Sequence, residues 1–167
     1  FGDFNPAGRL PFSVPRSVGQ IPLYYNKKAP QSHDYVEMSA SPLYPFGYGL
    51  SYTSFDYSDL HLSALMPRSF EISFKVRNTG KYDGEEVAQL YLRDEYASVV
   101  QPLKQLKHFA RFYLKRGEER EVKFILSEED FSLVDRNLKK IVEPGTFQIM
   151  IGAASNDIRL QTKVEIK

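Results

Sequence analysis

The sequence predicts an all-β chain: an antiparallel β-sandwich of the immunoglobulin or fibronectin type III kind, preceded by an irregular N-terminal strap rich in proline and tyrosine. Three observations support this prediction. Beyond residue 54, apolar and polar residues alternate with a period of two, as in strands with one buried face. Turn residues separate these stretches about every ten to fifteen residues, and no amphipathic helix lies between them. Such spacing favours a sandwich and excludes parallel α/β folds, which need crossover helices.

Residues 1–54 form the predicted strap. Seven of the ten prolines and six of the eleven tyrosines lie in it, and neither helical nor strand periodicity is sustained. Proline fixes its own φ and favours an extended predecessor, so the segment cannot be a helix and pairs only briefly as a strand. Disordered linkers are poor in aromatic residues. We therefore expect an ordered segment whose rings are buried between prolines against a surface, part of which belongs to a domain outside this sequence.

Residues 55–167 form the predicted sandwich. Clear alternation marks four strands, at residues 70–77, 120–126, 147–151 and 158–166. Two less regular strands are expected at residues 87–92 and 106–114, and we place both in the centre of a sheet.

Turn chemistry separates these strands, as in the Asn78-Thr79-Gly80 sequence. A capping-box pattern at residues 127–130 is the one helix-like signal, and it is too short for more than a turn or two.

Composition excludes several classes of function. The 22 basic and 21 acidic side chains leave a net charge of +1, so the concentrated basic face of a nucleic-acid or anionic-membrane binder is missing. No apolar run approaches the roughly 18 to 20 residues that span a bilayer, and no signal-peptide pattern opens the sequence. The absence of cysteine excludes disulfides, thiol chemistry and cysteine metal sites. We expect neither a nucleic-acid nor a membrane partner.

No catalytic constellation is recognisable. Ser32, His33 and Asp34 are adjacent in sequence, but a Ser-His-Asp triad is assembled by the fold rather than by adjacency, and G-x-S-x-G is absent. His61 and His108 stand alone in strand-like stretches, where a surface or packing role is expected, and scattered histidines form no ligand set. We predict no catalytic residue, no cofactor and no metal site.

Carbohydrate chemistry leaves only weak signals. Glycoside hydrolysis needs two carboxyls across a sugar ring, whereas most acidic residues here occupy outward strand positions or turns. Sugar-binding surfaces stack sugar rings on exposed aromatic side chains, often tryptophan, which this chain lacks. Four tyrosines are candidate platforms, although burial or half-burial in a sheet is the favoured interpretation of each: Tyr82, Tyr91, Tyr96 and Tyr113.

The most distinctive motif is PLYPFGYGLSYT at residues 42–53, preceded by NPAGRLP at 5–11 and GQIPLYYN at 19–26. Together these resemble the carboxy-terminal part of the family 3 glycoside hydrolases, the β-glucosidase and β-xylosidase group. Later motifs resemble the fibronectin type III-like domain that ends many of those enzymes: VRNTG at 76–80, GEEVAQLY at 84–91, LKHF at 106–109 and EPGTF at 143–147. Two residues depart from the family pattern: Ala7, where serine is usual, and His108, where glycine is common.

The resemblance implies a parent enzyme whose catalytic machinery lies upstream. In that family the nucleophilic aspartate and usually the acid/base glutamate precede this region, and no residue here matches either motif. The implied parent is a retaining, exo-acting β-glycosidase that hydrolyses terminal β-glycosides in carbohydrate catabolism. Residues 1–54 would be the linker leaving its α/β catalytic domain, and residues 55–167 the sandwich. The sequence opens at Phe1 rather than at methionine, which we interpret as a piece of a longer polypeptide.

Three hypotheses for function follow. In the favoured one, the sandwich and the strap buttress the catalytic domains of the parent chain. In the second, the chain is a carbohydrate-binding or substrate-rim module that contacts oligosaccharide through the strap motif or the loop of residues 94–100. In the third, for which the residues give no support, the chain is itself an enzyme. The expected interdomain or substrate-rim contacts are Tyr44, Phe46, Tyr48, Tyr52 and Tyr96. Because the enzymes it resembles are often periplasmic or secreted, we expect the same compartments here.

Overall fold

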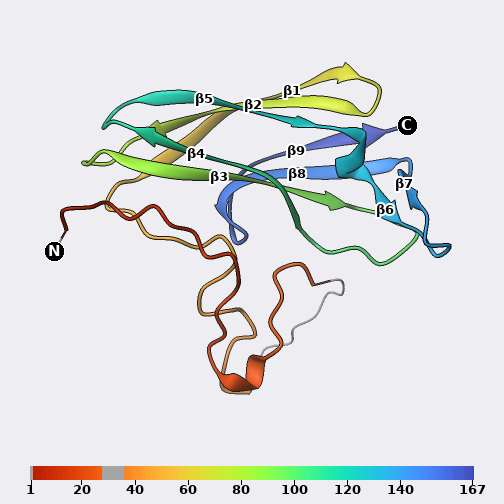
Figure 1. Cartoon of the computed structure of the whole chain (residues 1–167), viewed down its shortest axis with the longest axis horizontal. Coiled ribbons are helices and arrows are strands. Elements are labelled where there is room, and N and C mark those ends of the chain that lie inside the picture. The colour runs from red at the N-terminus through yellow and green to blue at the C-terminus, as the bar shows by residue number, and fades with distance from the viewer. Residues whose placement is uncertain (1, 28–35) are drawn as a thin grey trace.

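The computed structural model describes residues 2–27 and 36–167, and it confirms the all-β antiparallel sandwich (Figure 1). The described residues form nine strands and two 3₁₀ turns: η1 (Val18–Gln20), β1 (Phe55–Met66), β2 (Ser69–Asn78), β3 (Gly84–Asp94), β4 (Gln105–Leu114), β5 (Glu119–Leu126), η2 (Glu128–Phe131), β6 (Leu133–Val134), β7 (Lys140–Ile141), β8 (Gly145–Ala154) and β9 (Asp157–Ile166).

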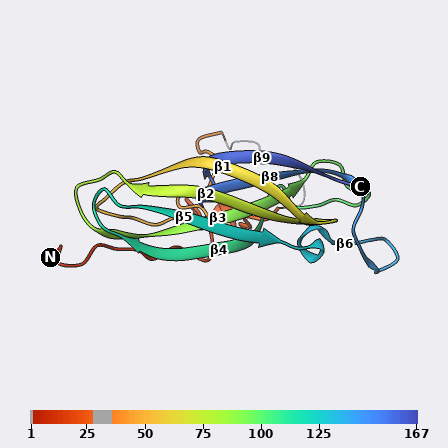
Figure 2. The same ribbon diagram turned by 90° about the horizontal axis from the view of Figure 1, so that it is seen from above.

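Two antiparallel sheets make the two layers of the sandwich. One has the strand order β1-β2-β5, and the other has the order β4-β3-β8-β9. Figure 2 shows the three-stranded sheet lying across the four-stranded one. The short β6–β7 hairpin follows η2 at one end.

The alternating apolar residues build the core between these sheets. In β2, Ile72 and Phe74 are almost fully buried, and they pair across the sheet with Phe124 and Val122 of β5. Leu90 of β3 is equally buried in the facing sheet. Each such side chain contributes roughly 1.5 to 3 kcal/mol when fully buried. The apolar residues that alternate in the sequence are therefore the ones that point into the core.

The two irregular strands differ in their positions. β3 is central, as predicted, with β4 and β8 on either side. The prediction that residues 106–114 are also central is wrong, because β4 is an edge strand. Its outer face carries the exposed Phe109 and Tyr113, and a register shift against β3 near Leu90 and Tyr91 breaks its alternation. The irregular pattern reflects a bulge and exposed rings rather than burial on both faces.

The predicted capping box is present in η2. The Asp130 carboxylate accepts a hydrogen bond from the Ser127 N–H over 2.8 Å, which satisfies a free donor at the start of the turn. The turn ends after Phe131, whose ring is buried in the core.

The strap lies on the outer side of the four-stranded sheet, away from the three-stranded sheet (Figure 1). It reaches the sandwich at the start of β1 and along the outer face of β3 and β8, so the strap and the core lie on opposite faces of the same sheet.

Candidate interdomain contact site

The strap consists of two arms, residues 10–14 and 43–48, that run antiparallel. Val14 and Tyr44 form an isolated β-bridge between them, and the Val14 N–H donates to the Tyr44 carbonyl over 2.8 Å. The prolines in both arms lack an N–H to donate, so the pairing stays short.

Gln20 closes the far end of the strap. Its side chain is buried, its Oε1 accepts from the Arg16 N–H over 2.5 Å, and its Nε2 donates to the Ser39 carbonyl over 2.9 Å. The Gln20 amide therefore connects Arg16 with Ser39, which are far apart in the sequence. A buried amide with both ends bonded specifies a single arrangement of the chain.

Gly47 brings the strap into contact with the sheet. The Gln89 Nε2 donates to the carbonyls of Gly47 over 3.3 Å and Ala153 over 2.5 Å, and the Tyr91 hydroxyl donates to the Gln89 Oε1 over 2.6 Å. Gly47 has a φ of +81°, and a Cβ at this residue would lie 2.2 Å from the Gln89 Oε1. Glycine is therefore required here on both conformational and steric grounds.

Two stacked rings fix the strap beside this contact. Phe46, in the second arm, and Tyr25, which lies between the two arms in the sequence, stack with centroids 3.9 Å apart. The Phe46 carbonyl accepts from the Ser155 N–H over 3.0 Å, and the Tyr25 hydroxyl oxygen accepts from the Leu106 N–H over 3.4 Å. The Phe46 backbone and the Tyr25 hydroxyl are thus bonded to the sandwich, and the two rings stack on each other.

A buried ion pair between Arg9 and Glu86 connects the strap to the sandwich. The Arg9 Nη2 lies 2.8 Å from the Glu86 Oε1, with 11% and 3% of the two side chains exposed. They line an open groove of about 910 Å³ that also contains Tyr57 and the pair Arg159–Asp157, 2.9 Å apart. Burial raises the pKa of the Tyr57 hydroxyl well above its usual range, so this group stays protonated.

A fourth set of contacts fixes the end of the strap where it enters β1. The Thr53 hydroxyl donates to the Oδ1 of the fully buried Asn78 over 2.6 Å. The Asn5 side chain donates to the Asp83 carbonyl over 2.9 Å and accepts from the Tyr52 N–H over 2.8 Å. The first residues of the chain and residues 52–53 are therefore joined at one end of the sandwich.

The five predicted contact residues do not form one site. Tyr44, Phe46 and Tyr48 lie together in one arm, and Tyr44 packs on Tyr48 with centroids 4.9 Å apart. Tyr52 is exposed at the entrance to β1. Tyr96 is 83% exposed in the loop between β3 and β4.

Three of the four candidate platforms differ from the favoured interpretation. Tyr91 is buried, as expected, with its hydroxyl bonded to Gln89. The expectation of burial or half-burial is wrong for Tyr82, Tyr96 and Tyr113, which are exposed. Turn and edge-strand positions place these three rings outside the core.

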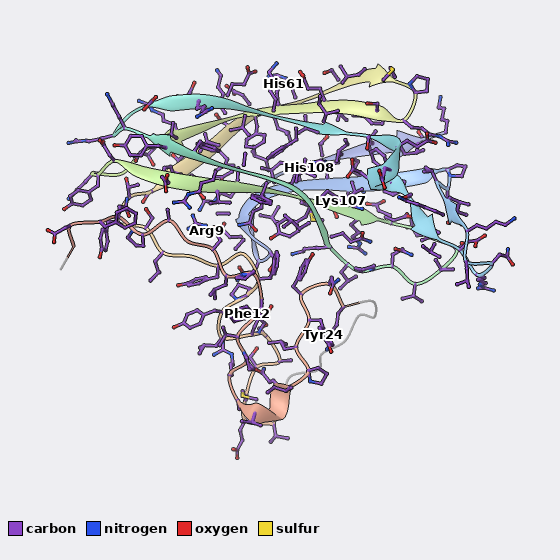
Figure 3. All side chains as sticks on the ribbon, in the orientation of Figure 1. Arg9, Phe12, Tyr24, His61, Lys107 and His108 are labelled. Atoms are coloured by element: carbon purple, nitrogen blue, oxygen red, sulfur yellow. The ribbon has the colours of Figure 1, made fainter. Side chains whose placement is uncertain are left out.

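The strap also carries an exposed apolar face that the motif analysis did not identify residue by residue. Two rings expected to be buried between prolines against a surface, Phe12 and Tyr24, are exposed in this chain and project from the strap in Figure 3. Exposed aliphatic side chains, on which the sequence analysis made no prediction, accompany them. The members of this face, called the strap face below, are Phe12, Val18, Ile21, Tyr24 and Leu43.

The histidines are not brought together. His61 is exposed on β1, whereas His108 of β4 is half-buried against Phe124, with its Nε2 3.4 Å from the Asp130 Oδ1 (Figure 3). The segment Ser32-His33-Asp34 lies outside the described residues. Across residues 2–27 and 36–167, no three side chains of the metal-binding types gather into a site. None of the helices in that same part of the chain has the length and apolar character of a membrane span.

The fold and this junction define a fibronectin type III-like sandwich with an aromatic strap fixed to its outer face. Residues 86–155 match the fibronectin type III-like domain, and residues 1–52 match the glycosyl hydrolase family 3 C-terminal domain. The chain belongs to the C-terminal part of the family 3 glycoside hydrolases, the β-glucosidase and β-xylosidase group, as its motifs indicated.

Known relatives are similar in sequence to this chain over nearly its whole length. A β-xylosidase of Formosa agariphila is 44% identical over 97% of this chain and 23% of the relative, and a periplasmic β-glucosidase of Salmonella typhimurium is 44% identical over 95% and 23%. A β-glucosidase structure from Erythrobacter marinus is 41% identical with a TM-score of 0.92, over 100% of this chain and 22% of that one. The chain thus spans about a quarter of the length of the relatives it matches.

Proposed function

We propose that this chain is a non-catalytic region of a β-glycosidase, in which the strap and the sandwich together buttress the catalytic domains. The observation that carries this proposal is the exposed strap face, on a segment that buried polar contacts already fix to the sandwich. Several exposed apolar side chains on a fixed segment indicate a partner that covers them. The remaining length of the relatives is the natural source of that partner.

The arrangement of carboxylates supports a non-catalytic role. Three carboxylates line the junction groove: Glu86 and Asp157 pair with the guanidinium groups of Arg9 and Arg159, and Asp56 alone is exposed without such a partner among the described residues. A retaining glycosidase needs two carboxyl groups across the sugar ring, one as acid and one as nucleophile. We assign hydrolysis of terminal β-glycosides, by a retaining mechanism, to the upstream part of such an enzyme.

The names of the relatives support the substrate class and the compartment of this proposal. The two curated relatives above are a β-xylosidase and a periplasmic β-glucosidase. We accordingly propose terminal β-glycosides as substrate and a periplasmic or secreted location.

The test is a point substitution in the complete enzyme. Ile21→Ser removes an exposed apolar side chain from the strap face, and Ile125→Ser is the matched control, since Ile125 is similarly exposed on β5 of the opposite sheet (63% and 55% exposed). We expect Ile21→Ser to lower the melting temperature of the catalytic domains and to reduce turnover, because an apolar contact is lost there.

The control should change neither quantity. Equal effects of the two substitutions on melting temperature and turnover would contradict the buttressing role.

A further inference from the structure

Three exposed tyrosine rings gather at the end of the sandwich where the strap enters β1. Tyr52, Tyr82 and Tyr113 are 55%, 60% and 51% exposed, and they come from the strap, the β2–β3 turn and β4. In the part of the chain that the structure describes, no other ring packs on any of them. We call these three residues the tyrosine cluster.

Hydrogen bonds fix the backbone at Tyr52 and Tyr82 and the ring hydroxyl of Tyr113. The Tyr52 N–H donates to Asn5, and the Tyr82 carbonyl accepts from the fully buried Asn78, both over 2.8 Å. The Tyr113 hydroxyl donates to the Asp83 Oδ2 over 2.8 Å. A fixed backbone limits where the Tyr52 and Tyr82 rings can lie, so less conformational entropy is lost when a ligand stacks on them.

A cleft of about 680 Å³ opens between two of the rings. Its lining residues are Gly2, Asp3, Asn5, Tyr52, Tyr82 and Asp83. The size lies within the roughly 300 to 1,000 Å³ of small-molecule sites. The N-terminal residues and the start of β3 lie at the same end of the molecule in both ribbon views (Figures 1 and 2).

The polar lining of the cleft consists mainly of hydrogen-bond acceptors. The Asn5 amide is already used on both sides, by Asp83 and Tyr52. The carboxylates of Asp3 and Asp83 also line the cleft, and no basic residue does. The Arg116 N–H and the Tyr113 hydroxyl lower the pKa of Asp83, so this carboxylate remains an acceptor.

This lining selects the chemistry of the ligand. Two carboxylates without a cation disfavour anions. A proline-rich peptide offers mainly carbonyl acceptors, which the carboxylates of Asp3 and Asp83 in the cleft lining cannot bond. A sugar ring has a flat C–H face for a tyrosine and hydroxyl donors for carboxylates.

We propose that the tyrosine cluster is a binding site for neutral β-linked oligosaccharide, in which sugar rings stack on Tyr52 and Tyr82 and sugar hydroxyls donate to Asp3 and Asp83. The choice of β-linked sugars rests on the proposed function. The site itself does not depend on whether the strap face docks on a catalytic domain.

The test is titration of the ¹⁵N-labelled chain with cellotetraose and xylotetraose, followed by amide chemical shifts. We expect saturable shifts at Asn5, Thr53 and Gly84, which surround the cleft. Tyr82→Ala should weaken binding about tenfold, the cost of about 1.4 kcal/mol in lost stacking. Tyr52→Ala, an independent variant, should act likewise, and Tyr82→Trp should retain binding.

Tyr96→Ala is the matched control, because Tyr96 is an exposed tyrosine in the loop that leaves the other end of β3. It should leave affinity unchanged. Binding that survives both Tyr82→Ala and Tyr52→Ala, binding lost in Tyr96→Ala instead, or no saturable shift around the cleft with either sugar would each overturn the proposal. Because the titration uses this chain alone, its failure leaves the docking proposal standing, and the reverse also holds.

Discussion

At Gly47 the backbone of the strap comes within hydrogen-bonding distance of Gln89, a side chain buried in the outer face of the four-stranded sheet. The strap is attached to the sandwich by a small number of buried polar contacts. The ion pair between Arg9 and Glu86 is another of them. The motif around Gly47 was recognisable in the sequence, but its partner Gln89 was not. Gln89 lies in a strand 42 residues away, and only the folded register brings the two together.

Gly47→Ala should destabilise the chain by about 2 to 4 kcal/mol, combining the cost of a left-handed alanine with the loss of buried hydrogen bonds. Gly117→Ala is the control, because Gly117 has a φ of +79° but nothing within 4 Å of a Cβ. It should cost about 1 to 2 kcal/mol from the backbone alone. Urea unfolding followed by near-ultraviolet circular dichroism measures both. Equal losses would show that the Gln89 contact does not hold the strap.

Arg9→Met should cost about 3 to 5 kcal/mol of unfolding free energy, because it leaves the buried Glu86 carboxylate without its cation. The matched control is Arg111→Met, which removes the exposed partner of the neighbouring Glu85 and should cost less than about 1 kcal/mol. Raising the salt concentration should leave the first loss nearly unchanged. Similar losses for the two variants in urea unfolding would mean that the Arg9 pair contributes no more than a surface contact.

At the scale of elements, clear alternation was sufficient to predict β2, β5, β8 and β9. β1 had no such signal, because Asp59 takes a φ of +53° and a register shift follows Ser58, so its period of two changes phase midway. The edge position of β4 was missed for a related reason. Alternation reports which face of a strand is buried, and it carries no information on which strands are neighbours.

At the scale of the whole molecule, the sandwich buries its own apolar side chains, whereas the strap leaves several of its apolar side chains exposed. The core lies between the sheets, whereas the strap face on the far side of the four-stranded sheet remains uncovered. The family could be predicted from the sequence. The strap face and the tyrosine cluster could not, because exposure depends on how the two arms pair and where the turn after β2 points.

The most direct test of the buttressing claim is hydroxyl-radical footprinting of the strap face in this chain alone and in the complete enzyme. The account predicts that oxidation of Phe12, Val18 and Tyr24 falls several-fold in the complete enzyme, while Ile125 on the opposite sheet reacts equally in both. Equal oxidation of the strap face in the two proteins would contradict it.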